Sequence, residues 1–240
     1  MKKIGLKGQL ALFLFAYLVF LSLRDADSLF FIKSMVAVGS CVAADALFSF
    51  LKVKKFKITD SSVITGLIIG FVLSSYAAWW LFLLAGILAI ASKHVIRFKG
   101  QHIFNPAGLG ILLVVVIFKQ AMHWHGAYTW SIIIPFGLYF VWRIRKLPIV
   151  YAYFLTYCLI CGIQSFWFKS AFLEQIQYAN YFFIFIMLIE PKTSPFSSHK
   201  KLAFGIMVSV MAAILYWLKA PYDAQLPALL IGNLVFRLYN

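Results

Sequence analysis

The chain has 240 residues, of which 63% are hydrophobic and 12% are charged, and its formal net charge at pH 7 is +15. A soluble domain carries roughly 25% charged residues, so this chain has too little polar surface to cover a globule in water. The composition therefore excludes an ordinary soluble protein and predicts an all-α integral membrane protein that lies in the lipid bilayer.

Ten apolar segments follow one another along the chain, centred near residues 16, 39, 69, 86, 113, 135, 158, 183, 210 and 231. The first segment has a basic start but no clear small-residue cleavage site. Because further apolar segments follow it, we interpret it as the first membrane span rather than a signal peptide. The pattern predicts about ten transmembrane helices.

The basic residues are distributed unevenly between the ends of these segments. If both termini lie inside, all but five of the 22 lysines and arginines are on the inner side, and the exceptions are Arg24, Lys33, Lys119, Lys169 and Lys219. This asymmetry predicts a multi-pass protein of the inner (plasma) membrane, with cytoplasmic termini and residues 119–127 outside. The charge is explained by topology, so no nucleic-acid partner is expected.

The apolar segments divide into two sets of five. The fifth ends near Phe118, so the second set crosses the membrane in the opposite sense to the first. We therefore predict two inverted five-helix repeats, residues 1–118 and 119–240. Repeats of this kind typically place a binding site at mid-membrane, where interrupted helices meet.

Several of the segments are short and are interrupted by polar residues. The third begins at Asp60, the fifth opens with the sequence FNPAGLG from Phe104, and the eighth ends at Glu190 and Pro191. Their apolar runs fall below the roughly 20 residues that a full crossing needs, which is typical of re-entrant or broken helices. Asn105 is expected to cap the fifth helix, with Pro106 as its first residue.

A few isolated polar residues have two interpretations each. Asp45 lies within a span, where an ionisable group is a functional candidate, but it is also placed to form an ion pair with Lys52 at the inner edge. Lys33 lies near an outer end, where its long side chain can reach the polar interface.

Two pairs of potential metal ligands occur, and neither makes a complete site. Cys158 and Cys161 supply two of the four ligands that an iron–sulfur centre takes, and buried cysteine is usually a small hydrophobe. His123 and His125 are two residues apart, which is the wrong spacing for one face of a helix. We predict no metal site, and no motif of a hydrolase or an ATPase is found.

Three separated motifs, ITDSSVITGLIIGFVLSSYAAWW, FNPAGLG and IEPKTSP, together resemble the RnfD/NqrB family. That family comprises membrane subunits of the Rnf and sodium-pumping NADH:quinone oxidoreductase complexes. The resemblance covers roughly residues 35–118 and 175–235. The matching residues are Asp60, Ser62, Thr65, Gly66, Leu67, Trp79, Trp80, Phe104, Asn105, Pro106, Ala107, Pro191 and Thr193, with Asp45, Asp223 and Asn233 also in place.

The resemblance implies a ten-helix inverted repeat, related to urea and ammonium channels, that takes part in flavin-linked electron transfer. In the family, FMN is esterified to the threonine of a Ser-Gly-Ala-Thr motif. The corresponding window here is Gln177 to Asn180, and Asn180 stands in the threonine's place. An amide has no hydroxyl to form a phosphoester, so no covalent FMN is expected at Asn180.

A non-covalent flavin, FMN or riboflavin, remains compatible with the resemblance. The predicted binding residues come from both repeats and are Ser62, Thr65, Gly66, Phe104, Asn105, Pro106, Glu190 and Thr193. A redox partner protein is expected, either a cytoplasmic reductase or other subunits of a complex. The alternative is a transporter or channel for small solutes or flavin, since the fold relatives are channels, and a third possibility is a scaffold subunit.

Overall fold

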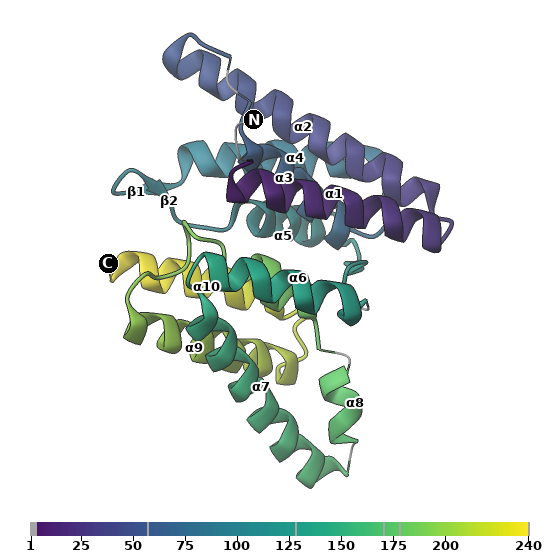
Figure 1. The fold of residues 1–240 in the computed structure, drawn as a ribbon, viewed down its shortest axis with the longest axis vertical. Coiled ribbons are helices and arrows are strands. Elements are labelled where there is room, and N and C mark those ends of the chain that lie inside the picture. The colour runs from purple at the N-terminus through teal and green to yellow at the C-terminus, as the bar shows by residue number, and fades with distance from the viewer. Residues whose placement is uncertain (1–3, 57, 128, 170, 178, 240) are drawn as a thin grey trace. The chain divides into compact units, whose positions relative to one another are not determined.

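The computed structural model describes residues 4–56, 58–127, 129–169, 171–177 and 179–239. Helices make up most of the described chain, with one short β-hairpin (Figure 1). The chain separates into two compact units, Met1–Gly126 and Ala127–Asn240, and each unit is described here by itself.

Unit 1 consists of five helices and the hairpin. The elements are α1 (Leu6–Arg24), α2 (Ser28–Val53), α3 (Asp60–Val72), α4 (Trp79–Val95), β1 (Arg97–Phe98), β2 (Gln101–His102) and α5 (Pro106–Phe118). The first five apolar segments are therefore confirmed as helices. The two strands pair antiparallel, with Arg97 opposite His102, and Gly100 takes a positive φ of 80° in the turn between them.

Unit 2 differs from the prediction at the eighth apolar segment. Its elements are α6 (Trp130–Arg143), α7 (Leu147–Phe168), α8 (Phe172–Gln177), the π-helix η1 (Phe183–Met187), α9 (Ser198–Trp217) and α10 (Gln225–Leu238). The expected eighth span is helical only over residues 181–187. Two prolines, Pro191 and Pro195, follow it closely and cannot donate the backbone hydrogen bonds that a longer helix needs. The separate helix α8 was not predicted.

The lengths of the helices fit a multi-pass membrane protein. Within the described residues, four are long and apolar enough to cross a membrane, namely Leu6–Arg24, Ser28–Lys52, Leu147–Trp167 and Ser198–Trp217. Four shorter apolar helices accompany them, Asp60–Val72, Trp79–Val95, Pro106–Phe118 and Gln225–Leu238. At 1.5 Å per residue, the shorter helices do not reach across a hydrocarbon core of about 30 Å. The all-α membrane class is confirmed.

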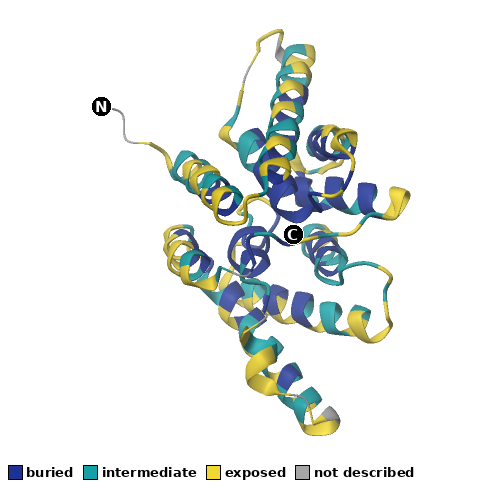
Figure 2. Cartoon of the chain, turned by 90° about the vertical axis from the view of Figure 1, so that its right-hand side faces the viewer, coloured by how far each residue is buried: buried dark blue, intermediate teal, exposed yellow. Residues whose placement is uncertain are grey.

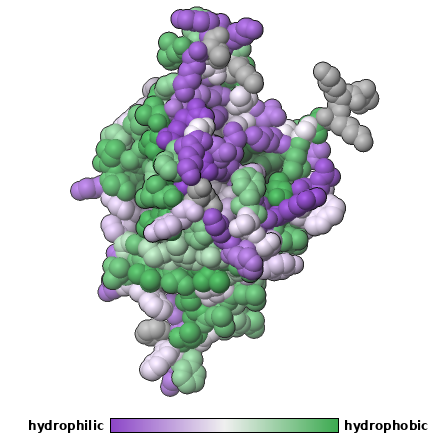
Figure 3. Space-filling view, turned by 90° about the vertical axis from the view of Figure 1, so that its left-hand side faces the viewer, coloured by the Kyte–Doolittle hydropathy of each residue, from purple (hydrophilic) through white to green (hydrophobic). Residues whose placement is uncertain are grey.

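The outer surfaces of the helices are apolar, as lipid contact requires. Buried residues gather on the inner sides of the helices (Figure 2), and broad hydrophobic areas reach the surface (Figure 3). On α7, Leu155, Leu159, Ile163 and Phe166 are all exposed and recur at the spacing of one helix face. In water such a stripe would promote aggregation, whereas in a bilayer it is solvated by acyl chains.

In each unit one pair of helices approaches closely at a glycine, namely α2 and α4 in unit 1 and α7 and α9 in unit 2. Gly86 is the eighth residue of α4, and a Cβ there would clash with Ser40 Oγ on α2. Gly205 is the eighth residue of α9, and a Cβ there would clash with the carbonyl oxygen of Ile149 on α7. In both helix pairs, a glycine at the eighth residue of the later helix permits the close approach.

The last helix of each unit packs in the same manner on the helix before it. In unit 1, Gly110 of α5 faces the carbonyl of Ala85 on α4, and in unit 2, Gly232 of α10 faces Val208 on α9. Unit 1 also packs α1 on α3, as unit 2 packs α6 on η1. The order of packing therefore agrees between the units, which is what an internal repeat predicts.

Candidate functional site

The predicted residues on α3 hold this short helix together and against α2. Ser62 and Thr65 are buried, and their hydroxyls donate at 2.7 Å to backbone carbonyls three and four residues earlier. A Cβ on Gly66 would clash with Val38 Cα, so the glycine lets the two helix backbones touch. Each hydroxyl retains acceptor capacity, but its proton is used within the helix.

The predicted cap at the start of α5 is confirmed. Asn105 is buried, and its Oδ1 accepts a hydrogen bond from the backbone N–H of Gly108 at 3.0 Å. Pro106 is the first residue of the helix, and Phe104, just before the cap, is half-buried. The cap satisfies one of the free N–H groups at this helix end, and the positive end of the helix dipole remains available to an electron-rich group.

The predicted residues of unit 2 lie together in the turn after η1. Thr193 Oγ1 donates to Glu190 Oε2 at 3.0 Å, and the N–H of Ser194 donates to the Glu190 carbonyl at 3.1 Å. The buried Asn233 of α10 donates its Nδ2 to the Thr193 carbonyl at 3.3 Å. Hydrogen bonds within the turn and from α10 therefore hold it in this conformation. Whether it meets the predicted residues of unit 1 stays a prediction.

Asn180 begins the short helix at residues 181–187. Its Oδ1 accepts from the backbone N–H of Phe183 at 2.9 Å, as a helix cap does. Its Nδ2 donates to Gln225 Oε1 at 2.7 Å, at the start of α10. Both ends of the amide are engaged in hydrogen bonds, which join the start of the short helix to the start of α10.

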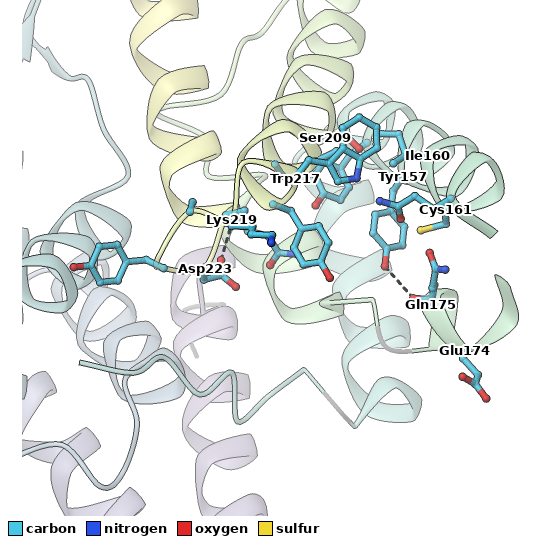
Figure 4. A pocket seen from close by; sticks show the side chains of 18 of the residues that line it. Tyr157, Ile160, Cys161, Glu174, Gln175, Ser209, Trp217, Lys219 and Asp223 are labelled. Atoms are coloured by element: carbon cyan, nitrogen blue, oxygen red, sulfur yellow. Dashed lines mark hydrogen bonds between the residues drawn. The ribbon is translucent and has the colours of Figure 1, made fainter. Parts of the chain in front are cut away.

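A cavity of about 1150 Å³ lies in unit 2, between α7, α8, α9 and the segment before α10 (Figure 4). Its walls combine aromatic and amide side chains with several alanines and a few charged or other residues. They include Tyr153, Tyr157, Tyr216, Tyr222, Trp217, Gln164, Gln175 and Gln225, with Cys161, Glu174, Ser209, Lys219 and Asp223. The eight residues predicted from the motifs are not among the described residues that line it.

Two polar groups define one wall of this cavity. The Tyr157 hydroxyl donates to the backbone carbonyl of Gln175 at 2.9 Å and so ties α7 to α8. Ser209 Oγ is buried and has no hydrogen-bond partner among the described residues. A buried hydroxyl without a partner is costly.

The sequence carried a signal for the cavity that the motifs did not reveal. Tyr153, Tyr157, Cys161 and Gln164 recur three or four residues apart along α7, and all four line the cavity. A polar stripe at helical spacing on an otherwise apolar span indicates a face turned away from lipid.

A profile of the NQR2, RnfD, RnfE family matches residues 3–133, which is more than half of the chain. The chain belongs to this family. The match covers unit 1 and stops at the start of α6, so the cavity lies beyond the matched part.

Individual members of the NQR2, RnfD, RnfE family share moderate sequence identity with the chain over short stretches. The chain is 33% identical over 96 residues to RnfD of the ion-translocating oxidoreductase complex of Shewanella amazonensis, covering 38% of this chain and 28% of that protein. It is 40% identical over 63 residues to the protein of that name in Pseudomonas aeruginosa, covering 26% and 18%. For Escherichia fergusonii the identity is 29% over 111 residues, covering 43% and 31%. The matched stretches span less than a third of each relative.

Within the family-matched part, Asp45 is the buried acid. Its carboxylate accepts from Thr59 Oγ1 at 2.7 Å and from Lys93 Nζ at 3.2 Å, and lies 3.1 Å from His94 Nε2. The interpretation as an ion pair with Lys52 is wrong, because Lys52 Nζ bonds the His94 carbonyl at 3.4 Å. Asp45 points across to the end of α4, not along its own helix. It joins α2, the start of α3 and α4.

The paired histidines lie in the loop after α5. The His125 ring stacks on Phe30 at 4.2 Å, and its two nitrogens are buried without partners among the described residues. Burial, with repulsion from His123, lowers the pKa of His125 to about 4. Among the described residues, no group of three or more His, Cys, Asp or Glu side chains could hold a metal ion.

Proposed function

We propose that this chain is a membrane subunit of an ion-translocating oxidoreductase complex, and that it carries electrons on a non-covalently bound flavin. The family match and the names of the relatives support the first part. The observation that carries the second part is the cavity of unit 2. Other subunits of such a complex are the proposed partners, in the bilayer and at the basic inner ends of the helices.

The cavity has the size and chemistry that a flavin requires. Small-molecule sites typically measure about 300–1,000 Å³ and combine apolar walls with a few polar groups, and this cavity exceeds that range slightly. An isoalloxazine ring has two flat faces and a hydrogen-bonding edge. Tyr157 and Trp217 offer aromatic surface to the faces, and Gln175, Gln225 and the unpartnered Ser209 hydroxyl offer hydrogen bonds to the edge.

The position of Asn180 supports this placement. The resemblance implies that the family attaches its FMN at this position, and here the Asn180 side chain is bonded to Gln225 of the cavity wall. A flavin held in the cavity would therefore lie near the family's attachment point without a covalent bond. The rival location is the helix-end site predicted from the motifs, with residues from both units.

The two units are proposed to be inverted repeats. The agreement in packing order supports a repeat, and the distribution of basic residues supports cytoplasmic termini. In a variant whose three native cysteines are replaced, a cysteine at Met122 should react with an impermeant thiol reagent from outside intact cells. A cysteine at Lys55 should not react. The opposite labelling pattern would overturn both the orientation and the inversion.

The flavin proposal is tested on the purified full chain. We expect a yellow protein that releases FMN or riboflavin on denaturation, identified by mass spectrometry. Ser209→Ala, which removes the hydroxyl without adding volume, should weaken flavin binding about tenfold, a loss of roughly 1.4 kcal/mol. Thr156→Val, the matched change on α7 outside the cavity wall, should leave binding unchanged. A colourless protein that conducts small solutes in liposomes would instead establish the channel function.

A further inference from the structure

One lysine in unit 1 closes the turn between its short third helix and its fourth. Lys33 projects from α2, and its Nζ donates to the backbone carbonyls of Ser75 at 2.6 Å and of Ala77 at 2.7 Å. These carbonyls lie in the turn between α3 and α4, outside either helix, where no helical hydrogen bond is available to them. The ammonium therefore satisfies backbone groups that lipid could not.

A lysine in unit 2 does the same for the turn before α9. Lys146 immediately precedes α7, and its Nζ donates to the carbonyls of Ser194 at 3.0 Å and of Pro195 at 2.5 Å. The ammonium also lies 4.3 Å from the centroid of the Phe196 ring. Lys146 is 1% exposed, so its charge is almost fully removed from water.

The two arrangements occupy the same place in their units. Ser75 lies four residues before the start of α4, and Ser194 lies four residues before the start of α9. Lys33 lies near the N-terminus of α2, and α4 packs on α2. Lys146 is the N-cap residue of α7, and α9 packs on α7. A contact from a lysine to the turn before a packed helix therefore occurs in each unit.

The two ammonium groups are removed from water to different degrees, because Lys146 is buried and Lys33 is partly buried. Among the described residues, neither lysine forms an ion pair with a carboxylate. Burial and the nearby Lys201 lower the pKa of Lys146 to about 8, so at pH 7 it is still mainly protonated. Among the described residues, the ammonium groups are compensated by the turn carbonyls that they contact and, for Lys146, by the ring of Phe196. In broken-helix transporters, such unwound carbonyls coordinate monovalent cations.

We propose that each of these two turns is a monovalent-cation site that is filled by the chain's own ammonium group. The lysine acts as a tethered cation: it holds the turn in its conformation and keeps a free ion out. It follows that a turn deprived of its lysine head group, with the apolar stem retained, will bind ammonium or sodium ions from solution. This inference does not depend on the flavin proposal.

The test uses the purified full chain and three variants, Lys33→Met, Lys146→Met and Lys119→Met. Methionine keeps an unbranched stem and leaves the ammonium position vacant. Lys119 is exposed and provides the matched control. Thermal unfolding is followed by tryptophan fluorescence in ammonium, sodium or tetramethylammonium chloride at equal ionic strength, because tetramethylammonium is too large to enter and donates no hydrogen bond.

Lys33→Met and Lys146→Met should each lower Tm by about 4 °C or more in tetramethylammonium chloride, since a hydrogen-bonded charge is lost. Ammonium or sodium should restore at least half of the loss with a saturable dependence. The unsubstituted protein and Lys119→Met should show the same Tm in all three salts. A loss that neither ion reverses, or no loss, would overturn the proposal. A variant that cannot be recovered even when it is purified in ammonium would also count against it.

Discussion

Asn180 and Gln225 are joined side chain to side chain, with Asn180 Nδ2 donating to Gln225 Oε1 at 2.7 Å. The same Asn180 side chain accepts from the backbone N–H of Phe183. One amide thus caps the short helix after residue 180 and ties it to the first residue of α10.

The first prediction is that any flavin leaves the protein on denaturation. Asn180 has no hydroxyl that could form a phosphoester, and both ends of its amide are already hydrogen-bonded. A denaturing gel of the purified protein should therefore show no flavin fluorescence in the protein band, while the supernatant of the denatured sample contains the flavin. A fluorescent band at the mass of the chain would show that the flavin is attached to another residue.

Local sequence signals predicted the helix starts well. The cap at Asn105 and the start of α3 at Asp60 depend on residues next to each other in the chain, and both are found as expected. The RnfD/NqrB resemblance is confirmed as well, because its motifs lie mostly in the family-matched residues 3–133.

Features that depend on tertiary packing were not predictable in this way. The partners of Asp45 come from α3 and α4, and only the close packing of α4 on α2 brings Lys93 and His94 within reach. The cavity requires α7, α8 and α9 together, and α8 was not expected at all. The eighth segment has the composition of a span, but the prolines that follow it limit its helix to a few residues.

The second prediction concerns Asp45. Asp45→Asn should lower the free energy of unfolding by about 3 kcal/mol or more, because it removes one partner of a buried ion pair and leaves Lys93 and His94 uncompensated. Chemical denaturation of the detergent-solubilised protein measures the loss.

Asp60→Asn provides the control for this change. Asp60 is an exposed carboxylate in the first turn of α3, so its loss should cost less than about 1 kcal/mol. Equal effects of the two substitutions would mean that the ion pairs of Asp45 contribute nothing to stability.

The third prediction is an acid sensitivity that arises at His125. Its pKa is about 4 in the folded protein and 6.5 without the fold, so the folded state favours the neutral ring. Between pH 6.5 and pH 4 the unfolded chain binds more protons at this residue. Stability should therefore fall as the pH falls through this window.

His125→Phe keeps the stacking on Phe30 and removes the titrating group. Its unfolding midpoint should decline less between pH 6.5 and pH 4 than that of the unsubstituted protein. His123→Gln is the matched change at the exposed neighbour, and it should retain most of the decline. If His125→Phe and the parent follow the same curve, the acid sensitivity arises elsewhere.

The last prediction separates the two proposed flavin locations. Asn105→Leu removes the cap of α5, at a cost of about 0.5–2 kcal/mol, together with any bond from its amide to a ligand. Thr193→Val removes a hydroxyl at nearly constant volume.

If both residues touch one flavin, each variant should bind it about tenfold more weakly, roughly 1.4 kcal/mol, while remaining monodisperse. The double variant should then fall short of the sum, because neighbours in one network are not additive. If both variants bind flavin as the parent does and Ser209→Ala does not, the flavin lies in the cavity of unit 2, and the FNPAGLG motif is a feature of the fold alone.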